Sequence, residues 1–176
     1  MKGWLVLAGL AVGLSSCLLE NSLGGSLGEV FPLDLSTVDV HQNEEALQVT
    51  YFRNRGVFLD VVVRVSISLQ DDGVSADGGV PTIELKPGKK LDLKGESQTG
   101  QLRCAVTHAP GGEPVRSLPR IKRGDLVITE GGKIGEKMKG NFSVLFEQEG
   151  GDVGFGRTLV GTFSTRESID AGFGDP

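Results

Sequence analysis

Residues 59–69 read LDVVVRVSISL. From Val61 onward every second residue is apolar, and most of the positions between them carry a charged or hydroxyl side chain. This spacing is typical of a β-strand that buries one face, because successive side chains of a strand point to opposite sides. We therefore predict a strand here, with Val61 and Val63 on the buried face and Val62 and Arg64 on the other.

The same alternation continues on both sides of this strand. Leu47, Val49 and Tyr51 alternate with polar residues upstream, and residues 54–56 read Asn-Arg-Gly. Glycine can adopt a positive φ, so these residues are predicted to turn the chain into a hairpin. Between Gly- and Pro-rich breaks, shorter strands are expected over residues 82–85, 90–93, 101–107 and 125–129.

The C-terminal part repeats a short motif. Gly-x-Phe-Ser occurs at residues 140–143 and again at residues 161–164, within two runs of alternating apolar residues. Two copies are too few for a repeat array, so we predict a hairpin. Eight or nine short strands joined by turns are typical of an all-β protein, here a single antiparallel β-sandwich or an open barrel.

The composition excludes one large class of partner. Lys and Arg number 18 and Asp and Glu number 23, which gives a formal net charge of −5. A nucleic-acid-binding domain usually carries a clustered basic excess, so we expect no nucleic-acid partner. Glycine accounts for 27 of the 176 residues, about twice its usual share of roughly 7%, which agrees with a chain rich in turns.

The N-terminus has the layout of a secretory signal peptide. Lys2 supplies a positive charge, residues 4–14 form an uncharged apolar run, and two serines precede Cys17. The run is too short to span a bilayer, which takes about 20 residues. We therefore expect residues 1–16 to be a signal peptide that is removed during export.

Leu14-Ser15-Ser16-Cys17 resembles the lipobox of bacterial lipoproteins. The resemblance implies a diacylglyceryl group on the sulfur of Cys17 and cleavage between Ser16 and Cys17. Two or more acyl chains hold a domain stably at a membrane. In this family an Asp after the cysteine commonly signals retention in the inner membrane; Leu18 stands there instead, which implies the outer membrane, on its periplasmic or its surface side. The C-terminal hairpin also loosely resembles that of many small, uncharacterised envelope lipoproteins of Gram-negative bacteria.

The mature chain is expected to have two parts. Residues 17–29 are rich in Gly and Ser and are predicted to form a lipidated flexible tether, followed by a β-sandwich domain over residues 30–176. Once Cys17 is lipidated, Cys104 is the one remaining thiol. It lies on the same predicted strand face as the apolar residues two positions before and after it. We therefore predict a small buried side chain rather than a nucleophile.

No catalytic or metal-binding constellation stands out. Ser26 lies in a Gly-x-Ser-x-Gly pattern, but a nucleophile elbow needs a strand before the serine and a helix after it, which a tether does not provide. His41 and His108 are the two histidines, their spacing matches no metal motif, and we expect both at the surface. We therefore predict no catalytic residue, no metal site and no cofactor.

A basic cluster is the candidate partner-binding site. Arg116, Arg120, Lys122 and Arg123 lie in a segment punctuated by proline, within a chain that is acidic as a whole. Guanidinium and ammonium groups bind carboxylates and other anions. These four residues are therefore candidates for contact with an acidic patch on a partner protein or with an acidic glycan.

The sequence favours a non-enzymatic function. We expect a membrane-anchored module of the bacterial envelope that binds, or provides structure to, a protein or glycan partner. Two alternatives stay open. One is an envelope hydrolase that uses dispersed carboxylates, which needs two of them to converge in an apolar cleft. The other is a small-ligand carrier, which needs a large apolar cavity inside the sheet.

Replacement of the lipobox cysteine tests the anchor. Cys17→Ser should abolish membrane anchoring, because a hydroxyl does not accept the lipid in this pathway, whereas Cys104→Ser should leave processing and location unchanged. Membrane flotation and the intact mass of the wild type and both variants provide the measurement. A wild type that stays soluble, with the mass of the bare polypeptide, contradicts the lipoprotein interpretation.

Overall fold

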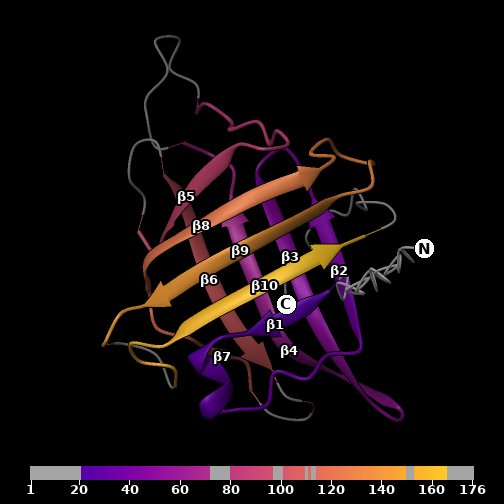
Figure 1. Ribbon diagram of the computed structural model, residues 1–176, viewed down its shortest axis with the longest axis vertical. Coiled ribbons are helices and arrows are strands. Elements are labelled where there is room, and N and C mark those ends of the chain that lie inside the picture. The colour runs from indigo at the N-terminus through magenta and orange to yellow at the C-terminus, as the bar shows by residue number, and fades with distance from the viewer. Residues whose placement is uncertain are drawn as a thin grey trace, which may run out of the picture.

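The computed structural model describes residues 21–71, 80–96, 101–109, 111, 114–149 and 153–165, with only the backbone at Phe58. The predicted signal peptide, the cleavage position and Cys17 lie outside these ranges. The all-β class is confirmed, since the described residues form ten strands and one short 3₁₀ helix (Figure 1). No helix among them has both the length and the apolar character needed to cross a membrane.

The strands form one curled sheet. The elements are β1 (Ser22–Gly24), η1 (Ser26–Glu29), β2 (Thr37–Gln42), β3 (Ala46–Arg55), β4 (Phe58–Ser68), β5 (Lys90–Lys94), β6 (Leu102–Ala109), β7 (Arg116–Ser117), β8 (Ile121–Glu130), β9 (Lys139–Phe146) and β10 (Thr158–Ser164). Their order across the sheet is β1-β10-β9-β8-β5-β6-β4-β3-β2, and β7 pairs with β6. The pairs are antiparallel except β5 with β6, so the sheet is mixed.

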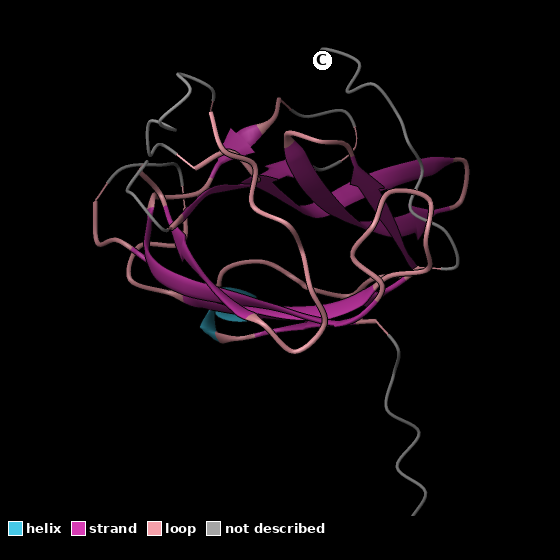
Figure 2. Cartoon of the chain, turned by 90° about the horizontal axis from the view of Figure 1, so that it is seen from above, coloured by secondary structure: helices cyan, strands magenta, loops and turns pink. Residues whose placement is uncertain are grey.

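The curl turns the sheet into a half-barrel with two walls. β8, β9 and β10 cross in front of β2, β3, β4 and β6 in Figure 1, and Figure 2 shows the two walls facing each other. Inward-facing apolar side chains from both walls form one buried cluster. The open barrel predicted from the alternation is therefore confirmed as a strongly curled sheet.

Tyr51 connects the two walls through the interior. Its hydroxyl, on β3, donates a hydrogen bond to the carbonyl oxygen of Thr162 on β10 at 3.0 Å. Its ring meets the ring of Phe142 on β9 edge-on, with 6.1 Å between the centroids. Burial raises the pKa of the Tyr51 hydroxyl, so the group remains a neutral donor. The interior between the walls is thus filled by side chains at this level.

The C-terminal hairpin is confirmed, and its packing explains the repeated motif. β9 and β10 are antiparallel, with Gly161 opposite Phe142 and Gly140 opposite Phe163. A Cβ on Gly161 would lie 2.5 Å from the Phe142 ring, and one on Gly140 would lie 2.5 Å from the Phe163 ring. Each ring therefore covers the glycine of the facing strand, and this reciprocal fit fixes the register of the hairpin.

A β-bulge in β4 corrects the predicted faces of this strand. Tyr51 pairs with Val63 and the next residue of β3 pairs with Val61, so Val62 is an extra residue. Before the bulge, the even-numbered residues of β4 face inward. After it, the odd-numbered residues do. Val62 and Asp60 are consequently buried, whereas Val61 is half-buried and faces outward. The prediction that Val61 faces inward and Val62 outward is wrong for this reason.

The flexible tether predicted over residues 17–29 is wrong for its described part. Residues 22–24 form β1, which pairs with β10, and Leu27 of η1 is fully buried in the core. Asn21 accepts a hydrogen bond from the backbone N–H of Ser164 through Oδ1 at 2.6 Å. The domain therefore begins by residue 21 rather than at residue 30.

Two further strands differ from expectation. The strand predicted over residues 82–85 is wrong, because Thr82 makes only an isolated bridge with Gln70. The strand predicted over residues 125–129 is confirmed but begins earlier, at Ile121, because a register shift between Ile121 and Arg123 lets the pairing with β9 continue through the basic segment.

The reciprocal Gly–Phe packing gives a stability test. Gly161→Ala should lower the free energy of unfolding by about 1–3 kcal/mol, because its Cβ would overlap a ring that closely packed neighbours hold in place. Gly28→Ala is the matched control, since its Cβ would meet Leu33 at an ordinary 3.5 Å. Urea unfolding measures both. Equal midpoints for the two variants would show that the Phe142 ring does not pack on Gly161.

Candidate functional site

A groove runs over the outer face of the wall formed by β5, β8, β9 and β10. Its volume is about 450 Å³, and it is lined by Lys90, Asp92, Arg123, Gly124, Asp125, Ser143, Val144, Leu145 and Thr158. The alternation of β5 places Lys90 and Asp92 outward because Leu91 and Leu93 are buried. Four charged side chains of both signs therefore gather on a small area of sheet.

Cross-strand pairing sets the order of charges in the groove. Asp92 lies opposite Asp125 on β8, and Asp125 lies opposite Ser143 on β9. Two carboxylates directly opposite each other repel. The ammonium of Lys90 lies 3.4 Å from Oδ1 of Asp125 and offsets part of this repulsion. Arg123 lines the same groove, so two cations and two anions line its walls.

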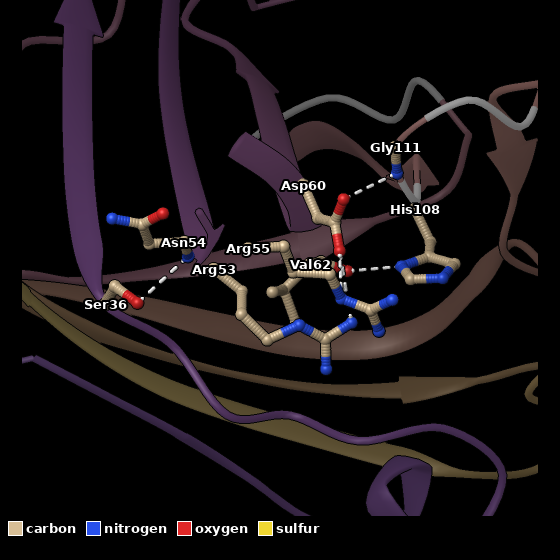
Figure 3. Close-up of polar contacts among 8 residues, drawn as sticks. All are labelled: Ser36, Arg53, Asn54, Arg55, Asp60, Val62, His108 and Gly111. Carbon is tan, nitrogen blue, oxygen red and sulfur yellow. Dashed lines mark hydrogen bonds and ion pairs between the residues drawn. The ribbon is translucent and has the colours of Figure 1, made fainter. Parts of the chain in front are cut away.

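A second polar cluster surrounds Asp60 at the start of β4 (Figure 3). Asp60 is only 3% exposed. Its Oδ1 accepts a hydrogen bond from the backbone N–H of Gly111 at 2.7 Å. Its Oδ2 lies 2.8 Å from Nε of Arg55 and 3.4 Å from Nη2 of Arg53. Both oxygens of the carboxylate are therefore engaged, and the cluster ties the β3–β4 hairpin to the segment after β6.

His108 is buried beside this cluster, which corrects the prediction of a surface position. Its Nδ1 lies 2.6 Å from the carbonyl oxygen of Val62, the extra residue of the bulge. Because a carbonyl can only accept, Nδ1 carries the proton. The ring stacks on Phe31 with 4.3 Å between centroids. The histidine thus satisfies a carbonyl that the bulge displaces from regular pairing.

The two histidines lie on opposite faces of the sheet. His108 points inward from β6, whereas His41 alternates with buried Val40 and Gln42 and faces outward from β2. They cannot ligate one metal ion in this arrangement. Within the residues that the structure describes, no three His, Cys, Asp or Glu side chains come together as a set of metal ligands.

Two potential nucleophiles have structural contacts. Ser26 follows β1 and opens η1. A strand therefore does precede the serine, contrary to the expectation from the sequence. Its Oγ lies 3.2 Å from Oγ1 of Thr158 and accepts the Thr158 N–H at 3.0 Å, which docks η1 on β10. Cys104 is buried as predicted, and burial raises the pKa of its thiol. A thiol held in its neutral form is a poor nucleophile.

The four basic candidates do not act as one uncompensated patch. Arg120 pairs with Glu96. Lys122 faces a hollow that it shares with Glu147 and Glu149. Arg123 lines the outer groove, and Arg116 lies on β7, which pairs with β6 in the other wall.

The sequence contained part of the signal for the outer groove. The alternation in residues 90–94 already places Lys90 and Asp92 on one face. The antiparallel pairing of β5 with β8 brings Asp125 to the same place. No short-range pattern encodes that pairing, so the groove could not be assembled from the sequence.

Comparison with known proteins adds no family to this description. A scan against protein-family models, a search of curated proteins and a search of solved structures each found no match to the chain.

Neutralising Asp60 tests the polar cluster. Asp60→Asn keeps an acceptor for Gly111 but removes the charge that faces Arg53, so the free energy of unfolding should fall by about 1.5–3 kcal/mol. Asp39→Asn, at an exposed position of β2, should change it by less than about 0.5 kcal/mol. Denaturant unfolding of both variants provides the measurement. If Asp60→Asn lowers the free energy of unfolding no more than Asp39→Asn does, the cluster does not stabilise the fold.

Proposed function

We propose that this protein is a lipid-anchored module of the bacterial envelope that binds a charged protein partner through the outer groove. The anchor is supported by the signal-peptide layout and by the lipobox resemblance at Cys17. The single observation that carries the binding role is the gathering of Lys90, Asp92, Arg123 and Asp125 on one open sheet face.

The lining of the groove favours a protein over a glycan. Charges of alternating sign suit a partner with a complementary pattern, because electrostatic complementarity sets orientation and excludes wrong partners. Ser143 and Thr158 add hydroxyl groups that can donate or accept. None of the described residues that line the groove is aromatic, so this lining offers no ring on which a sugar can stack.

The same groove is less suited to hydrolysis. Asp92 and Asp125 do converge, as a hydrolase needs, but Asp92 is exposed and both carboxylates share the groove with cations. A general acid must hold its proton near neutral pH, which an apolar setting or a neighbouring carboxylate without nearby cations favours. The carrier alternative lacks support as well, because Tyr51 and Phe142 meet in the space between the walls.

Site-specific photocrosslinking in intact envelopes tests the binding face. A photoreactive amino acid in place of Ser143 should give a discrete crosslinked protein. The same amino acid in place of Asp39, an exposed position on β2 in the other wall, should not. Asp125→Lys should reduce the yield from position 143 about tenfold, because a reversed charge opposes the partner.

Two outcomes would contradict the proposal. Equal labelling from positions 143 and 39 would show that the groove is not the contact surface. A heterogeneous crosslinked product that resists proteases would identify a glycan in place of a protein.

A further inference from the structure

The folded domain begins very close to the predicted lipid anchor. Three residues separate Cys17 from Asn21, where the chain is already hydrogen-bonded to the end of β10. Four Cα–Cα steps span at most about 14 Å even in an extended chain. If Cys17 carries the lipid, as the proposed function holds, the surface around Asn21 must therefore lie at the membrane.

That surface continues from β1 to the β3–β4 hairpin. Asn21, Ser22 and Leu23 line a groove of about 460 Å³ together with residues 33–36. At the far side of this groove, Oγ of Ser36 accepts a hydrogen bond from the backbone N–H of Asn54 at 3.0 Å. Asn54 lies near the end of β3, directly before the turn. Figure 3 shows Ser36 pointing toward Asn54 at the end of β3.

The tip of the hairpin exposes large apolar side chains. Val57 is 94% exposed and Leu59 is 58% exposed. Leu59 faces outward because the bulge at Val62 turns the even-numbered residues of this end of β4 inward. A protruding pair of apolar side chains gains free energy when a partner removes it from water.

A guanidinium group is fixed beside this tip. Arg55 pairs with Asp60 through Nε, and its side chain remains 61% exposed. The pair holds Arg55 in place while its outer nitrogens face solvent. Arginine in such a position can bind the phosphate of a phospholipid headgroup. An apolar tip with a neighbouring arginine matches the order of a membrane surface, in which acyl chains lie beneath phosphates.

We propose that the tip of the β3–β4 hairpin, with Val57 and Leu59, inserts into the headgroup region of the membrane to which the lipid anchors the protein, and that Arg55 binds anionic phospholipid headgroups there. The lipid and the hairpin then form two points of attachment. Two points fix how the domain is oriented on the membrane, which a single lipidated residue cannot do.

The sequence offers a clean fluorescent probe for this contact. Trp4 is the single tryptophan and lies in the predicted signal peptide, so the mature protein should contain none. Val57→Trp places one at the exposed tip. In the full lipidated protein, reconstituted into vesicles with anionic phospholipid, its emission should shift to shorter wavelength than in detergent-free buffer. Brominated acyl chains should quench the emission.

Two controls separate the hairpin from the anchor. Phe155→Trp places the tryptophan in the β9–β10 connection, where Phe155 is 47% exposed. This connection leads into β10 at Thr158, the opposite end of the strand from Ser164, to which Asn21 is hydrogen-bonded, so the emission should not respond to brominated lipid. Arg55→Gln combined with Val57→Trp should lose most of the shift in anionic vesicles.

The outcomes distinguish the two proposals. Tryptophan emission from the wild-type protein purified from membranes would show that the signal peptide is retained, and the anchor proposal would fail. A cleaved and lipidated Val57→Trp protein whose emission matches that of Phe155→Trp would overturn the hairpin proposal alone. A shift in native envelopes but not in protein-free vesicles would also overturn it, because the tip would then bind a protein.

Discussion

One extra residue in β4 controls both the interior and the surface at one end of the half-barrel. Because Val62 is inserted into the pairing with β3, the strand changes which side chains face inward. Asp60 enters the interior, where it needs cations, and Arg53 and Arg55 provide them. The displaced carbonyl of Val62 needs a donor, and His108 provides it. The same reversal turns Leu59 outward. The buried ion cluster and the exposed tip therefore have one cause.

The sequence predicts those elements whose pattern is local. Alternation alone locates β3, β4 and the β9–β10 hairpin, because each contains a run in which apolar residues alternate with other residues. It cannot place the bulge, because three consecutive valines hide a change of face. It also misses β1, whose Gly- and Ser-rich sequence resembles a linker and becomes a strand only because β10 offers an edge.

The candidate site was harder to predict than the fold for a related reason. A groove is made by strands that are neighbours in space, and β5 and β8 are separated by β6 and β7 along the chain. The outer groove and the hairpin tip belong to different walls. A substitution in one of these two surfaces can therefore be studied with little effect on the other.

If the chain is exported as we propose, the pairing of β1 with β10 has a consequence for that export. Ser22 and Thr162 share a side-chain hydrogen bond across 140 positions of sequence. The first strand thus has no partner until the last strand has left the translocation channel, and closing so long a loop is slow. During that interval β1 remains unpaired and accessible. Under the proposed assignment, enzymes that modify Cys17 and cleave before it would act before folding draws β1 into the sheet.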